Sequence, residues 1–148
     1  MTRPRYQAGG TLALLVVTVA LGLGSRIYRG ALPFVIAEYA GDTLWATAVF
    51  LGLRLVRPSA PRLALAAVAL AISFCVEFSQ LAHPPWLDAL RQRPGVALIL
   101  GYDFVPADLV CYTAGVALAC AIDAVRRAGD GRGPGSTGRC DNRWRFRQ

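Results

Sequence analysis

The sequence has no lysine, and charged residues of either sign are scarce. All 16 basic residues are arginine, and only 17% of the 148 residues are charged. We attribute the missing lysine to the bias of a GC-rich genome. A water-soluble domain of this size would need more charge to cover its surface. With 55% hydrophobic residues, the composition instead favours a membrane protein.

Familiar chemical motifs are also missing. The four cysteines form no CxxC pair, and three of them lie in apolar stretches, where a thiol behaves as a small hydrophobe. The sequence contains no GxSxG, GxxxxGK[ST] or HExxH. We therefore expect no disulfide framework, no metal site and no cofactor. A membrane-embedded enzyme stays open as an alternative.

Positive charge is concentrated at the C-terminal end. Residues 126–148 carry seven arginines and two aspartates, whereas residues 1–125 carry nine arginines and seven acids. Glycine and proline are so dense here that we expect residues 128–148 to be a disordered, Arg-rich cytoplasmic tail. A basic tail can bind nucleic acid, but next to an apolar helix it is better explained as a topology signal. We expect no nucleic-acid partner.

Four apolar stretches approach the roughly 20 residues that a helix needs to cross a bilayer. We expect spans at about residues 8–25, 39–56, 63–81 and 107–125. The second is marginal, because only 11 uncharged residues separate Asp42 from Arg54. It crosses only if both ends reach the headgroups by snorkelling. The fold class is then all-α: a polytopic integral membrane protein with a four-helix domain over residues 1–127.

The arginine distribution predicts the topology. With the N-terminus inside, the inner side carries twelve arginines and the outer side four, which follows the positive-inside rule. We expect a multi-pass protein of the bacterial inner membrane with both termini in the cytoplasm. The first uncharged stretch, residues 7–25, is longer than the usual signal core of about 7–15 residues. A retained first span is therefore expected.

The two outer loops contain short apolar pieces. Residues 32–36 are expected to rest on the membrane surface. Residues 96–100 are too short to span, so we expect an interfacial or re-entrant segment there.

Polar residues from separate spans would meet at the outer end of the bundle. Glu77 and Gln80 are three residues apart and share one face of the third span. Asp108 and Tyr112 are spaced similarly on the fourth. A carboxyl group near hydrocarbon is costly, so a cluster of them calls for a reason. The candidate ligand-binding residues are Arg26, Asp42, Trp45, Glu77, Gln80, His83, Arg91, Asp103, Asp108 and Tyr112.

Several of these residues also have a structural explanation. Asp42 and Asp108 would each begin a helix, where an acidic side chain caps free N–H groups and suits the helix dipole. Arg26 would snorkel to the headgroups. His83 precedes two prolines and is more often a loop residue than a ligand. Glu77 is harder to explain in this way, because it lies inside an apolar helix.

Five ordered segments form a larger pattern. They are Gly41 to Trp45, Glu77 to Leu81, Pro85 to Arg91, Leu100 to Phe104 and Asp108 to Gly115. Over about residues 26–122 this pattern resembles the bacterial membrane family called "domain of unknown function 2809". The resemblance implies a small multi-span protein and no assigned activity.

A looser likeness links the chain to VanZ-like proteins, a teicoplanin-resistance family. It rests on a Glu and a Gln one turn apart, then an Arg, then an Asp before a Gly-containing last span. The asparagine usual in the last motif of that family is missing here. The matching positions are Glu77, Gln80, Arg91, Asp108 and Gly115.

We expect the outer-facing carboxylates and an arginine to hold a charged envelope molecule, such as an anionic lipid or a lipid-linked precursor headgroup. One alternative is a membrane-embedded enzyme that acts on such a headgroup, with Glu77 or Asp108 as general base. Another is a small proton-coupled carrier that uses Glu77. A third is a scaffold that recruits partners through Gly115 and Ala119, a small-xxx-small pair that permits close helix contact.

Overall fold

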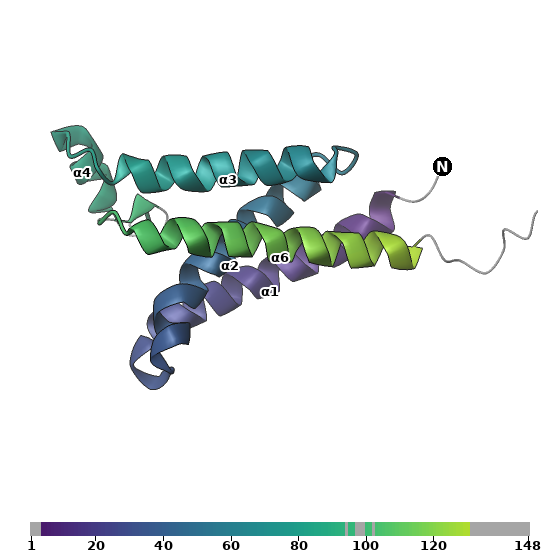
Figure 1. The fold of residues 1–148 in the computed structure, drawn as a ribbon, viewed down its shortest axis with the longest axis horizontal. Helices are drawn as coiled ribbons and strands as arrows, with labels where there is room; N and C mark the ends of the chain where they lie inside the picture. The colour runs from purple at the N-terminus through teal and green to yellow at the C-terminus, as the bar shows by residue number, and fades with distance from the viewer. Residues whose placement is uncertain (1–3, 94, 97–99, 102, 131–148) are drawn as a thin grey trace, which may run out of the picture.

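The computed structural model describes residues 4–93, 95–96, 100–101 and 103–130, and this part of the chain is helical (Figure 1). Within it, four helices are long and apolar enough to cross a membrane. The expected all-α, multi-pass membrane protein is thereby confirmed. In chain order the elements are α1 (Pro4–Ile27), the 3-10 helix η1 (Arg29–Ala31), α2 (Phe34–Val56), α3 (Arg62–Ser79), α4 (Pro85–Arg91) and α6 (Pro106–Asp130).

Two expected segments fall largely outside this range. The predicted tail over residues 128–148 is described only to Asp130, where α6 ends. Residues 97–99 of the predicted interfacial segment also lie outside the described residues.

The other three long helices pack around α2. Helix α1 pairs with α2, α6 packs on α2, and α3 contacts both α2 and α6. In Figure 1 the α1–α2 hairpin crosses α6 and diverges from α3 toward the end where α4 lies. The end of α1, the start of α2, the end of α3 and the start of α6 are therefore at one end of the bundle.

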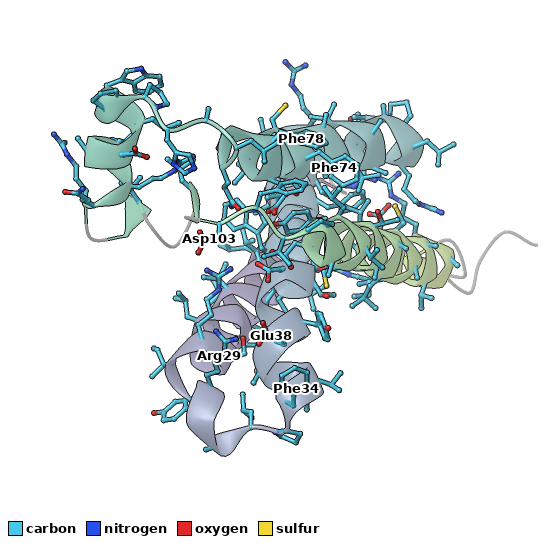
Figure 2. All side chains as sticks on the ribbon, turned by 60° about the vertical axis from the view of Figure 1, so that its left-hand side comes forward. Arg29, Phe34, Glu38, Phe74, Phe78 and Asp103 are labelled. Atoms are coloured by element: carbon cyan, nitrogen blue, oxygen red, sulfur yellow. The ribbon has the colours of Figure 1, made fainter. Side chains whose placement is uncertain are left out.

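Large apolar side chains cover the outside of the long helices. Figure 2 shows them standing out from the helices, with Phe34 at the start of α2 and Phe78 near the end of α3 among the exposed ones. Val16, Leu63 and Val110 are likewise exposed on the other helices. Water-soluble monomers rarely expose apolar surface on this scale, whereas lipid tails favour it.

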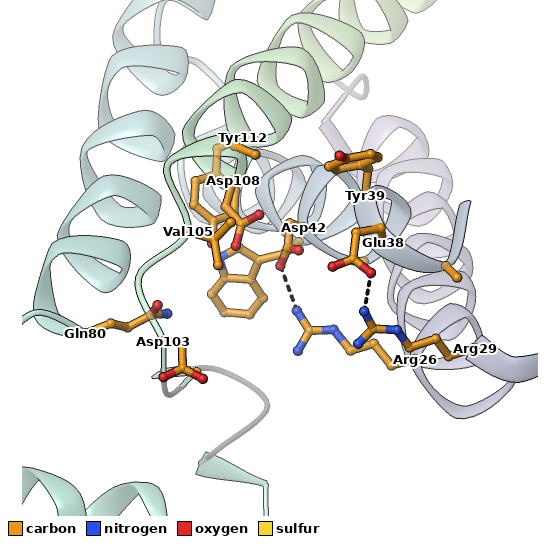
Figure 3. A pocket seen from close by; sticks show the side chains of 15 residues that line it. Arg26, Arg29, Glu38, Tyr39, Asp42, Gln80, Asp103, Val105, Asp108 and Tyr112 are labelled. Atoms are coloured by element: carbon orange, nitrogen blue, oxygen red, sulfur yellow. Dashed lines mark hydrogen bonds and ion pairs between the residues drawn. The ribbon is translucent and has the colours of Figure 1, made fainter. Parts of the chain in front are cut away.

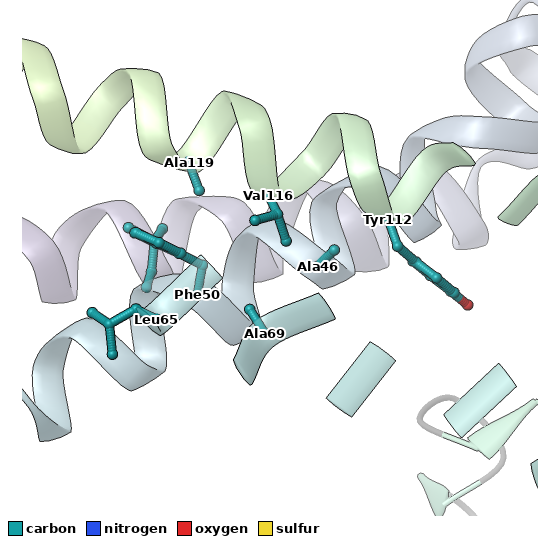
Figure 4. Packing of buried hydrophobic residues seen from close by; sticks show 8 residues of the cluster. Ala46, Phe50, Leu65, Ala69, Tyr112, Val116 and Ala119 are labelled. Atoms are coloured by element: carbon teal, nitrogen blue, oxygen red, sulfur yellow. The ribbon is translucent and has the colours of Figure 1, made fainter. Parts of the chain in front are cut away.

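The core forms where α2, α3 and α6 meet (Figure 4). Small residues alternate with large ones there, which lets the helices approach closely. Its buried residues are Ala46, Phe50, Leu51, Leu65, Ala69, Tyr112, Val116 and Ala119.

Helices α2 and α6 make their closest contact at Gly115. A Cβ atom at this position would overlap the carbonyl oxygen of Thr43 and lie 3.2 Å from the Cβ of Ala46. The hydroxyl of Thr47 lies 2.9 Å from the carbonyl oxygens of both Thr43 and Gly115 and donates toward them. The predicted close contact through Gly115 and Ala119 is confirmed. Because both residues are buried within the chain itself, they are not available to a partner, contrary to the scaffold hypothesis.

The start of α2 differs from the prediction. The helix begins at Phe34, so Asp42 lies two turns inside it and does not cap its N-terminus. Residues 34–36 form the first turn of α2 instead of a separate surface segment. Glu38 and Asp42 therefore both lie within the helix, and Arg29 and Arg26 pair with them from outside α2.

A second ionic cluster closes the opposite end of the bundle. Oδ2 of Asp123 accepts a hydrogen bond from Arg54 at 2.8 Å and lies 3.3 Å from both Arg62 and Arg127. Arg54 is only 5% exposed and also donates to the carbonyl of Ala60 at 2.8 Å. Arg54 is therefore paired within the protein at this end of the bundle, and the ion pair offsets part of the cost of burying its charge.

The Gly115 contact generates a stability prediction. Gly115→Ala should lower the free energy of unfolding in detergent by about 1–3 kcal/mol, because the new methyl group must push α2 away. Gly52→Ala on α2 is the matched control, since a Cβ there meets nothing within 4 Å. It should be neutral or stabilise by up to about 1 kcal/mol. Equal unfolding midpoints for the two variants would contradict the tight contact.

Candidate ligand-binding site

A cavity of about 450 Å³ opens at the end of the bundle where α1 ends and α2 and α6 begin (Figure 3). Its wall consists of the last turn of α1, the first three turns of α2, the end of α3 and the segment that leads into α6. This volume is typical of small-molecule sites. The charged residues that line it are Arg26, Arg29, Glu38, Asp42, Asp103 and Asp108.

Two ion pairs cross from α1 and η1 to α2 on one side of this cavity. Nη2 of Arg26 lies 2.9 Å from Oδ1 of Asp42, and Arg29 pairs with Glu38 (Figure 3). Such partly exposed pairs each contribute little to stability. Their effect on the site is to match each arginine of the wall with one carboxylate. Arg26 therefore bonds to Asp42, and its snorkelling to the headgroups stays a prediction.

Two further carboxylates of the wall have no such match. Within the described residues, no hydrogen bond or ion pair reaches the side chain of Asp103 or Asp108. Asp108 lies in the first turn of α6, as the sequence predicts, where the helix dipole favours a negative charge. Asp103 is held near the cavity by its neighbour Phe104, whose ring stacks on Phe78 at 6.0 Å. The described wall thus has more acidic than basic side chains.

Glu77 connects α3 to the segment before α6. Its side chain is fully buried. Oε1 accepts a hydrogen bond from the backbone N–H of Val105 at 2.7 Å, and Oε2 accepts one from the hydroxyl of Tyr112 at 2.9 Å. Both oxygens have donors inside the protein, as a buried carboxyl group requires. Glu77 is not among the described residues that line the cavity, so it supports the wall from behind.

Gln80 presents an acceptor at the cavity. Its Nε2 donates a hydrogen bond to the carbonyl of Leu100 at 2.9 Å. This bond fixes the orientation of the amide group and therefore the position of Oε1. The residue is 6% exposed, yet no donor among the described residues reaches Oε1. Gly101, which has φ +60°, lets the backbone pass so close to Gln80 that a Cβ there would overlap Nε2.

An apolar groove adjoins the cavity. This hollow of about 300 Å³ lies along α1 and α2 and is lined by Val19, Leu44 and Ala48 among others. It shares Arg26, Gly41 and Trp45 with the polar cavity, so the two hollows adjoin at these residues.

Two predicted site residues lie elsewhere. Arg91 is fully buried and donates to the carbonyls of Ser79 at 2.6 Å and Ala82 at 3.0 Å, and to Asp88 at 3.0 Å. It therefore satisfies carbonyls at the end of α3 and fixes α4. His83 is exposed, with its Nδ1 3.5 Å from Asp88. Neither residue lines the cavity.

The structure brings together Arg26, Asp42, Trp45, Gln80, Asp103, Asp108 and Tyr112, and it adds residues that the sequence analysis missed. Arg29 follows Arg26 by three residues, and Glu38 precedes Asp42 by four. These are the spacings that put side chains on one face of a helix. A search for a second side chain of the same charge at these spacings from Arg26 and Asp42 would have found both.

Residues 31–116 match the family model described as "Protein of unknown function (DUF2809)". This range confirms the resemblance seen in the sequence. It includes the cavity residues from Ala37 to Tyr112 and leaves out Arg26 and Arg29. No solved structure matches the chain.

The Glu77 contacts generate a prediction about the wall. Tyr112→Phe should lower the free energy of unfolding by about 1–3 kcal/mol, because it leaves Oε2 of Glu77 buried without its donor. Tyr39→Phe is the matched control. It also removes a tyrosine hydroxyl from the cavity wall, but no described residue forms a hydrogen bond with the Tyr39 hydroxyl. This control should change stability by less than about 0.5 kcal/mol. If chemical denaturation finds equal losses, the Tyr112–Glu77 bond does not hold the wall.

Proposed function

We propose that this chain, which belongs to the DUF2809 family of proteins of unknown function, binds the polar headgroup of a membrane lipid or lipid-linked envelope precursor in its charged cavity. The observation that carries the proposal is that the polar cavity and the apolar groove lie side by side and share Arg26, Gly41 and Trp45 as lining residues. A ligand that fills both must be polar at one end and apolar at the other. Lipids have this chemistry, and the groove lies along two membrane-spanning helices.

The cost of charge in a membrane supports the same proposal. Acidic side chains at membrane depth are expensive and usually mark functional sites. Asp42 and Asp108 both lie within helices long enough to span, and both line the cavity. Asp42 is already paired with Arg26, and a bound headgroup would give Asp108 a partner that hydrocarbon does not.

We further propose that the protein lies in the bacterial inner membrane with both termini in the cytoplasm, which puts the cavity at the outer surface. The arginine distribution of the sequence supports this orientation. The end opposite the cavity carries the cluster of Arg54, Arg62 and Arg127 around Asp123. A headgroup would then enter from the outer leaflet.

One observation favours a second function, an enzyme that acts on the bound headgroup. The carboxylate of Asp108 faces the cavity without a hydrogen-bond partner among the described residues, so it could accept a proton from a ligand. Glu77 suits this role less well, because both of its oxygens already accept hydrogen bonds. Turnover of a lipid-linked substrate that disappears in Asp108→Asn would favour the enzyme.

The groove generates the test of lipid binding. Ala48→Phe should fill the groove and reduce the lipid that remains bound to the purified protein in native mass spectrometry by roughly tenfold, which corresponds to about 1.4 kcal/mol. Ala67→Phe makes the same change on the exposed surface of α3 and is the matched control. It should leave bound lipid unchanged, and thermal unfolding checks that both variants are folded. The same lipid occupancy in the wild type and Ala48→Phe would refute the proposal.

A further inference from the structure

We infer that the cavity selects a lipid whose headgroup has a protonated primary amine joined to a phosphate, that is, an aminoalkyl phosphate. This inference rests on the proposed function and names the class of headgroup that the site would take. It departs from the sequence-based expectation of an anionic lipid. The reason is the balance and arrangement of the polar groups that line the cavity.

The charge balance of the wall favours a cationic group. Arg26 and Arg29 are each paired with a carboxylate of α2. Asp103 and Asp108 remain without an arginine partner among the described residues. A headgroup whose only charge is negative would meet these two carboxylates unmatched, and like charges repel. An ammonium group instead pairs with them.

Gln80 independently indicates that the ligand donates hydrogen bonds. Its Oε1 is a buried acceptor of the wall with no donor among the described residues. Figure 3 shows the Gln80 amide extending from α3 toward Asp103. A buried acceptor without a donor costs free energy, so a ligand N–H at this point would stabilise the complex. A primary ammonium has three N–H donors, whereas a quaternary ammonium has none.

The position of Arg26 accounts for the phosphate. Its side chain lines both the cavity and the groove, and it is 37% exposed. A guanidinium group has five donors, so Arg26 can pair with Asp42 and still face a phosphate oxygen. In a phospholipid the phosphate lies between the apolar chains and the headgroup amine. The wall has the same order, from the groove through Arg26 to Asp103, Asp108 and Gln80.

A metal ion fits this wall less well. Within the part of the chain that the structure describes, no three His, Cys, Asp or Glu side chains come together as metal ligands. The adjoining groove is lined mainly by apolar residues, which are not metal ligands.

The test uses the full chain in lipid nanodiscs with equal amounts of phosphatidylethanolamine, phosphatidylglycerol and phosphatidylcholine that have identical acyl chains. Native mass spectrometry then measures which lipid stays bound. Phosphatidylethanolamine should be enriched about tenfold or more over the other two, as expected for hydrogen bonds to charged groups. Phosphatidylglycerol supplies hydroxyl donors without the positive charge, and phosphatidylcholine supplies the charge without N–H donors.

Asp108→Asn should remove most of this enrichment while leaving total bound lipid nearly unchanged. Asp103→Asn is a second variant at an exposed residue, and it should also reduce the enrichment. If the wild type retains phosphatidylglycerol or phosphatidylcholine as readily as phosphatidylethanolamine, the amine inference is wrong although lipid binding stands. If the wild type retains no more lipid than Ala48→Phe, the proposed function itself fails.

Discussion

The close contact between α2 and α6 at Gly115 is the constraint on which the candidate site depends. Only a residue without a side chain lets the backbone of α6 reach the carbonyl of Thr43 on α2. Asp42 precedes Thr43 directly, and Asp108 lies two turns before Gly115. The contact therefore determines that these two acids, from distant parts of the chain, line one cavity. A wider spacing of the helices would separate them and expose both to lipid.

The acids of the membrane domain are satisfied in three different ways. Asp42 pairs with an arginine across the hairpin, and Glu77 accepts hydrogen bonds from a tyrosine and a backbone amide. Asp123 gathers three arginines at the opposite end. Only Asp103 and Asp108 lack such partners in the described structure. This contrast distinguishes acids that hold the fold together from acids that are available to a ligand.

Sequence reasoning succeeded where spacing along one helix decides the outcome. Glu77 and Gln80 do share the buried face of α3, and Tyr112 does lie on the inner face of α6. It failed where side chains choose partners across the fold. Arg91 has the charge expected of a binding residue, yet it turns to the carbonyls at the end of α3. Asp42 was expected to start a helix, but α2 begins two turns earlier at Phe34, and Asp42 instead pairs with Arg26 of another helix.

The sequence by itself determined the four spans and the end of the bundle at which the acids collect. The length of a membrane span and the face on which a residue lies both depend on residues close together in the sequence. The length of an apolar stretch and the spacing of its polar residues therefore suffice to predict them. Only the tertiary structure decided which acids find partners and which face the cavity. Hydrogen bonds such as that between Tyr112 and Glu77 join residues 35 positions apart, and their formation depends on how closely two helices pack. Gly115 permits that packing, but only the tertiary structure shows that the carbonyl it contacts is that of Thr43.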